Sequence, residues 1–171
     1  VVVDDTGTYD LGPDGHDIAW YPSADSTPDF GRAHLLGRVL ATSLHFRGAL
    51  VLHGSAVAYD DGAAIFLAPK HTGKSTLALA LTLAGARLIS DDSLAVDPGA
   101  APTVAPGIQS MRLVRDAAAR LVGSLPSAPQ SDGKVLLTDL PEERLETGRV
   151  PVRAIYLLTA AESIAENRAA D

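Results

Sequence analysis

The sequence contains no cysteine among its 171 residues, which excludes disulfide bonds, thiolate metal sites and a cysteine nucleophile. It also has no run of about twenty apolar residues, the length that a membrane-spanning helix needs. The first three valines lack a basic flank and precede two aspartates, so no signal peptide is expected. Basic residues are scattered singly in a chain of net charge −7, which gives no patch for a nucleic-acid backbone. We therefore predict a cytoplasmic protein that binds neither membranes nor nucleic acid.

The apolar content of 46% is enough for one globular domain, because a chain of this length buries about two thirds of its unfolded surface. Residues 1–31 are rich in Gly, Pro, Asp and Ser, which predicts an irregular or peripheral β segment. Residues 32–171 carry the alternating patterns of an α/β domain. These patterns predict helices over 32–46, 75–84 and 115–122, and strands over 49–59, 63–67, 86–90, 108–114, 133–138 and 152–159. The last strand is continuously apolar and is expected to be buried.

One segment between an apolar strand and an apolar helix has the composition of a phosphate-binding loop. It consists of Ala68, Pro69, Lys70, His71, Thr72, Gly73, Lys74, Ser75 and Thr76. Such a loop presents backbone N–H groups and a helix N-terminus to polyphosphate oxygens, while Lys74 reaches the β- and γ-phosphates and Ser75 ligates Mg²⁺. Ala68 replaces the usual first glycine, and the Gly-Lys-Ser core is intact. The segment predicts a nucleoside triphosphate site; the alternative is an ordinary turn that binds nothing.

A histidine upstream of this loop is a second candidate. Asp61-Gly62 is typical of a two-residue hairpin turn between the strands over 49–59 and 63–67. In that register Ser55 pairs with Ala68, and His53 pairs with Lys70 at the mouth of the loop. The alternative is a histidine that is simply satisfied within the sheet.

Two adjacent aspartates follow the next predicted strand. The helix travels about 15 Å away from the loop in ten residues, and five strand residues return about 16 Å. Asp91 and Asp92 should therefore arrive level with the bound phosphates, at the sheet edge where ligands bind. One carboxylate there can hold Mg²⁺, and the other can accept a proton from an attacking hydroxyl. Without the loop, the pair would be read as a turn or a helix cap.

Four further segments, taken together with the loop, form a combination that is more specific than any of them alone. They are Leu-His-Gly-Ser-Ala at 52–56, Gly-Ala-Arg-Leu-Ile-Ser-Asp-Asp at 85–92, Pro-Gly at 106–107 with Arg-Leu at 112–113, and the apolar strand at 154–158. Together these residues resemble the HPr serine kinase family, and more closely its shorter relatives that modify lasso peptides. The resemblance covers residues 35–158.

The resemblance implies a fold like that of phosphoenolpyruvate carboxykinase, with a phosphate-binding loop and a central mixed β-sheet flanked by helices. It also implies ATP- and Mg²⁺-dependent phosphorylation of a serine, or a similar hydroxyl, on a peptide or small protein. By the resemblance His53 lies in the active site, Asp91 is the base and Asp92 the Mg²⁺ partner, with an exchange of these two roles left open. Lys74 stabilises charge on the transferred phosphoryl group.

The chain departs from true HPr kinases in two ways. It lacks their Arg-Gly-hydrophobic-Gly signature after the aspartates, and their separate N-terminal domain. Neither HPr as the substrate nor the reverse phosphorolysis therefore follows from the resemblance. A small-molecule kinase and a nucleotide-binding regulatory module with weak ATPase activity are the alternative functions. The acceptor, a preference for ATP over GTP, and a homo-oligomer are left open.

Overall fold

The computed structural model describes residues 1–122, 128–129, 134–138 and 140–159. The chain begins with an antiparallel sheet of three strands, β1 (Val2–Asp4), β2 (Gly7–Leu11) and β3 (Ile18–Pro22). Tyr9 is buried at its centre, stacks on Trp20 at 6.0 Å between ring centroids, and donates a hydrogen bond to the carbonyl of Gly31. The expected irregular β segment is thus an ordered meander.

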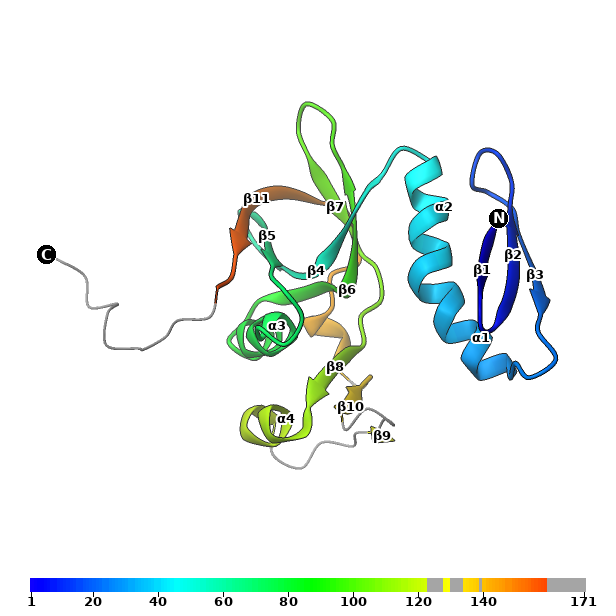
Figure 1. Cartoon of the computed structure of the whole chain (residues 1–171). Coiled ribbons are helices and arrows are strands. Elements are labelled where there is room, and N and C mark those ends of the chain that lie inside the picture. Colours follow the sequence, from blue (N-terminus) through cyan, green and yellow to red (C-terminus); the bar gives the residue numbers. More distant parts are fainter. Residues whose placement is uncertain (123–127, 130–133, 139, 160–171) are drawn as a thin grey trace, which may run out of the picture.

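One long helix connects this meander to the rest of the molecule (Figure 1). It comprises α1 (Pro28–His34), a π-helical turn η1 (Leu35–Val39) and α2 (Leu40–Phe46). The predicted helix over 32–46 is therefore present and starts four residues earlier. Gly48 follows it with φ +84°, the left-handed conformation that commonly ends a helix.

The centre of the fold is a mixed sheet of five strands. They are β4 (Leu50–Tyr59), β5 (Gly62–Leu67), β6 (Arg87–Asp97), β7 (Thr103–Ala105) and β11 (Val150–Leu157), in the order β11-β5-β4-β6-β7. β4 is antiparallel to both of its neighbours, and β11 is parallel to β5. Because β11 also pairs with β7 through Val150 and Pro151, the sheet closes into a small barrel. The expected α/β class with a central mixed sheet is confirmed, and its closure was not predicted.

Two apolar clusters stabilise this arrangement, one on each face of β4. Small and branched side chains fill the barrel, among them Ala56, Ile65, Leu94 and Val104. The outer cluster contains Val57 and lies beneath helix α3 (Lys74–Leu83). It also includes residues of β8 (Met111–Val114), α4 (Arg115–Val122) and β10 (Lys134–Leu137), and 3₁₀ helix η2 (Glu142–Arg144) follows β10 in the chain. A short strand β9 (Ala128–Pro129) completes the outer sheet, in the order β8-β10-β9.

The predicted hairpin register is wrong by two residues. Tyr59 pairs with Gly62, so the turn is Asp60-Asp61, and Ser55 lies opposite Phe66 rather than Ala68. Gly62 has φ +135°, and a Cβ there would lie 2.9 Å from the carbonyl oxygen of Pro151. The glycine therefore permits the close approach of β11 and does not form the turn.

Two other strands differ from the prediction. The strand over 86–90 does not end at the aspartates: β6 continues to Asp97, because β4 is long enough to pair with it throughout. The strand over 152–159 is β11, but its outer half is not buried, and Leu157 is 78% exposed. Only Val150 and Pro151 pair with β7, so beyond them β11 has one described neighbour, β5.

Some predicted features fall outside the described residues, namely Gly133 of the strand over 133–138 and residues 160–171 of the main domain. Within the described ranges, no helix combines the length and apolarity that crossing a bilayer requires.

Candidate functional site

The predicted phosphate-binding loop connects the end of β5 at Leu67 to the start of α3 at Lys74. His71 and Gly73 both have positive φ, +66° and +96°, which turns the chain sharply into the helix. A Cβ on Gly73 would meet nothing within 4 Å, so glycine is favoured there by its backbone angle rather than by space. The N–H groups of the first turn of α3 have no partner within the helix, which leaves them available to an anion.

Lys74 is the one buried cation of the loop, with 7% of its surface exposed. Its Nζ donates hydrogen bonds to the carbonyl oxygens of Ala68, at 2.9 Å, and Pro69, at 3.2 Å. These contacts hold the ammonium group over the loop and compensate part of its desolvation. The remaining predicted loop residues lie on the same turn: Lys70 and His71 are exposed, and Thr72, Ser75 and Thr76 are half-buried.

Asp91 is the point where four elements meet. Its carboxylate accepts a hydrogen bond from the Ser55 hydroxyl of β4 at 2.5 Å. The side chain of Ser75 in α3 and the backbone N–H of Arg112 in β8 lie near enough to the carboxylate to lower its pKa. The residue is 3% exposed. Burial raises the pKa of Asp91; the side chains of Ser55 and Ser75 oppose this, and the neighbouring charge of Asp92 adds to it. The acidic strand thereby adjoins the phosphate-binding loop.

Asp92 has the opposite environment, although it is the next residue. Its side chain is 69% exposed, and its φ of +74° is uncommon for a residue other than glycine. His53 lies beside it, with Nδ1 donating to the backbone carbonyl of Asp92 at 2.9 Å and lying 3.3 Å from its carboxylate. Such uncommon backbone angles cluster at functional sites.

The predicted site residues therefore form two adjoining groups. One contains Lys74, Ser75 and Asp91, and the other contains His53 and Asp92. His53 does not pair with Lys70, as the shifted register explains; it pairs with Ser93, one residue beyond the point where the ladder of β4 and β5 stops. The prediction missed Ser55. Its place two residues after His53, and hence on the same face of the strand, is the signal that could have identified it.

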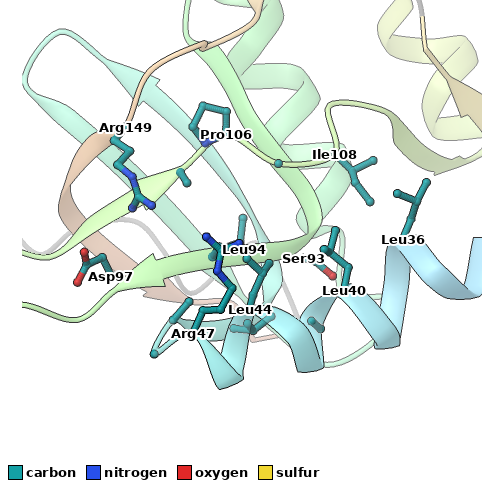
Figure 2. A pocket seen from close by; sticks show the side chains of 17 residues that line it. Leu36, Leu40, Leu44, Arg47, Ser93, Leu94, Asp97, Pro106, Ile108 and Arg149 are labelled. Atoms are coloured by element: carbon teal, nitrogen blue, oxygen red, sulfur yellow. The ribbon is translucent and has the colours of Figure 1, made fainter. Parts of the chain in front are cut away.

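Two hollows flank helix α2. The α2–β6 pocket has a volume of about 400 Å³ and holds none of the predicted site residues. Figure 2 shows its lining: Leu36, Leu40 and Leu44 along the helix, Pro106 and Ile108 opposite, and Arg47, Arg149 and Asp97 toward one end. The α2–β4 hollow adjoins this pocket, with which it shares Ala41, Val51 and Ser93; it has a volume of about 410 Å³ and includes His53.

Oxygen donors suited to Mg²⁺ are present at the loop, because the Ser75 hydroxyl lies near enough to the Asp91 carboxylate to lower its pKa. In the part of the chain that the structure describes, no cluster of three or more acidic or histidine side chains could hold a metal alone. This fits a cation that is bound mainly through nucleotide phosphates and needs one or two protein ligands.

Comparisons with known proteins give a distant structural likeness. No family model matches the sequence, and no curated protein matches it. Among solved structures, the chain is similar to the HPr(Ser) kinase/phosphatase from Coxiella burnetii, with 16% identity and a TM-score of 0.44. The match covers 67% of this chain and 69% of the other. A likeness at this level does not assign an activity, so the function has to be argued from the site.

Proposed function

We propose that the protein is a Mg²⁺-dependent kinase that transfers the γ-phosphoryl group of ATP to a serine, or a similar hydroxyl, of a peptide or small protein. The observation that carries this proposal is the buried carboxylate of Asp91, which accepts a hydrogen bond from Ser55 and lies near enough to Ser75 for that side chain to lower its pKa. The aspartates of β6 thus adjoin the phosphate-binding loop, and such a loop with carboxylates beside it is the combination that phosphoryl transfer uses.

The nucleotide is bound by the loop over 68–76. The N–H groups of the first turn of α3 donate hydrogen bonds to the phosphate oxygens, and Lys74, whose Nζ is held over the loop by the carbonyl oxygen of Ala68, contacts the terminal phosphates. In the transition state, charge spreads over the oxygens of the transferred group. A fixed ammonium stabilises that charge without reorganisation, which accounts for much of the rate in this chemistry.

The environments of the two aspartates favour the exchanged assignment of their roles. Asp91 is buried and lies near Ser75, so we assign it with Ser75 to the metal. Bound Mg²⁺ would neutralise charge on the phosphates. Asp92 is exposed and can reach an acceptor, so we assign it as the base. It takes the proton of the acceptor hydroxyl while the hydroxyl oxygen bonds to the γ-phosphorus and the bond from that phosphorus to ADP breaks. His53 holds Asp92 by its hydrogen bond to the backbone carbonyl and is a positioning residue.

A small-molecule kinase is the second candidate, and the α2–β6 pocket favours it. A volume of about 400 Å³ is within the range of pockets that enclose a metabolite. The pocket borders Ser93, which follows Asp92 in the chain, so a small acceptor bound there would lie near the acidic pair. A regulatory module that binds nucleotide with only weak ATPase activity is the third candidate.

The test is incubation with γ-labelled ATP, Mg²⁺ and a degenerate peptide library with one fixed serine. We expect serine labelling by the wild type and a loss of at least about a hundredfold in Lys74→Ala, because a charge-stabilising group is removed. Arg120→Ala, on the exposed side of α4, is the control and should label normally. Labelling of metabolites alone would favour the second candidate, and nucleotide binding with slow hydrolysis but no labelled acceptor would favour the third.

A further inference from the structure

The outer face of strand β4 connects the proposed reaction centre to helix α2. Side chains alternate along a strand, and Leu52 and Ala56 point into the barrel. The intervening residues point outward in a row: Val57 packs beneath α3, Ser55 bonds to Asp91, His53 bonds to Asp92, and Val51 borders the helix. This row runs from beside the phosphate-binding loop to α2. Ser55 is fully buried and His53 is exposed, so a ligand contacts the row from His53 onward, toward the helix.

The row ends in the α2–β4 hollow. Arg38, Ala41, Thr42 and His45 line it from the helix, and Val51, Leu52, His53 and Ser93 line it from the strands. None of these lining residues is acidic, although the whole chain has a net charge of −7. Arg38 is exposed, and within the described ranges its guanidinium forms no ion pair. The hollow therefore presents the guanidinium of Arg38, without an ion-pair partner among the described residues, close to Asp91 and Asp92.

We propose that the α2–β4 hollow is the acceptor subsite and binds an acidic side chain of the substrate peptide through Arg38. This inference rests on the proposed kinase function and specifies its substrate class. Val51, which lines the hollow, lies two residues from His53, the residue that holds the proposed base Asp92, or about 7 Å along the strand. An extended peptide has nearly the same rise, so the acidic residue stands about two positions from the phosphorylated serine.

The α2–β6 pocket fits this occupant less well. It shares Ala41, Val51 and Ser93 with the hollow but does not include His53, and it already contains a carboxylate, that of Asp97, in addition to its two arginines. The hollow has His53 in its wall, which places it next to the group that holds Asp92. Continuity with the acidic pair and a lining without a carboxylate therefore both favour the hollow for an acidic peptide.

The degenerate serine library with γ-labelled ATP also tests this inference when the labelled peptides are sequenced. We expect Asp and Glu to be enriched about two positions from the labelled serine. The enrichment should disappear in Arg38→Gln and persist in Arg47→Gln, which removes an arginine that lines only the other pocket. For one selected peptide, Arg38→Gln should raise KM about tenfold, or about 1.4 kcal/mol, and leave kcat unchanged.

The outcomes separate the two proposals. Labelled peptides without acidic enrichment, or an enrichment that survives in Arg38→Gln, would overturn the subsite while leaving the kinase intact. An unchanged affinity for ATP in Arg38→Gln shows that the variant is folded, so a loss of selectivity then reports on the acceptor. If the wild type binds ATP and labels no peptide of the library, the peptide-kinase function fails and the subsite fails with it.

Discussion

The two ends of the outer face of β4 differ in how far their polar groups are buried and in whether these groups are hydrogen-bonded or ion-paired within the protein. At the end beneath α3, Asp91 is 3% exposed and bonded to Ser55, and Ser75 and the backbone N–H of Arg112 lie near enough to lower its pKa. At the end beside α2, Asp92 is 69% exposed, and Arg38 has no carboxylate partner among the described residues. These two ends are called the buried end and the open end below.

This difference matches what each end would have to recognise. A triphosphate and its cation are the same in every turnover, so a site for them gains from preorganised groups that are held in place by packing. An acceptor enters and leaves, and a base must reach its proton, so the groups that contact it have to be accessible. The contrast also explains how adjacent aspartates in one strand can take different roles.

Exchanging each carboxylate for an amide is the strongest test of the contrast. Asp92→Asn should lower kcat by at least about a hundredfold with little change in ATP affinity, because the base of the open end is lost. Asp91→Asn should raise the Mg²⁺ concentration needed for half-maximal activity by about tenfold or more, because a metal partner of the buried end is lost. Both are measured by steady-state kinetics across a Mg²⁺ titration.

The pattern of the two variants is what distinguishes the assignments. If Asp91→Asn lowers kcat at saturating Mg²⁺ while Asp92→Asn shifts the Mg²⁺ requirement, the two roles are the reverse of those proposed here. Equal effects of both variants on both quantities would mean that the two ends are not functionally distinct.

The buried end was largely predictable because its signals are local in the sequence. The loop over 68–76 combines a strand, a glycine with positive φ and a helix within a few residues, and the lengths of helix and strand fix where Asp91 returns. Ser55 was missed because its contact with Asp91 crosses 36 positions of sequence. The helix over 32–46 was found for the same local reason, from its apolar spacing.

The open end and the hairpin depend on contacts that sequence patterns do not show. Gly62 reads as a turn residue, yet it serves a close approach to Pro151, almost ninety positions later. The exposure of Leu157 depends on how far β7 extends beside β11, which no pattern within β11 records. The hollow likewise exists only because α2 packs against β4 and β6.

Removal of one donor from the buried end should have a smaller effect. Ser55→Ala deletes the hydroxyl that bonds to Asp91, which should cost about 1–3 kcal/mol of unfolding free energy and raise the pKa of Asp91 further. Activity should fall about tenfold, since the carboxylate is less firmly held. Ser43→Ala is the matched control, because Ser43 is also buried and bonds to the carbonyl of Gly15.

The control should lose about 1 kcal/mol of stability and keep full activity, because Ser43 lies on the side of α2 that contacts the loop between β2 and β3. Denaturant unfolding and peptide labelling of both variants give the comparison. If Ser55→Ala also retains full activity, the buried end does not depend on a fully bonded Asp91.

The smallest expected effect is at Arg87, which is not one of the proposed site residues. Arg87 contacts two carboxylates, one buried and one exposed, and so offers the same contrast in burial. Glu146 is 15% exposed and accepts from Arg87 Nε at 2.9 Å, whereas Asp60 is fully exposed at 3.7 Å. Hydrogen bonds from the backbone N–H of Gly148 and from Arg87 hold the pKa of Glu146 below its ordinary value of 4.5. Its contribution to stability is therefore complete above pH 4.5 and is lost as the pH falls through the lower folded-state pKa.

Glu146→Gln should cost about 1 kcal/mol at pH 7 and nothing below that pKa, while Asp60→Asn should cost almost nothing at either pH. Thermal unfolding of the wild type and the two variants between pH 3 and pH 7 measures these costs. An equal loss of stability in the two variants would show that burial does not decide how much a carboxylate contributes to stability.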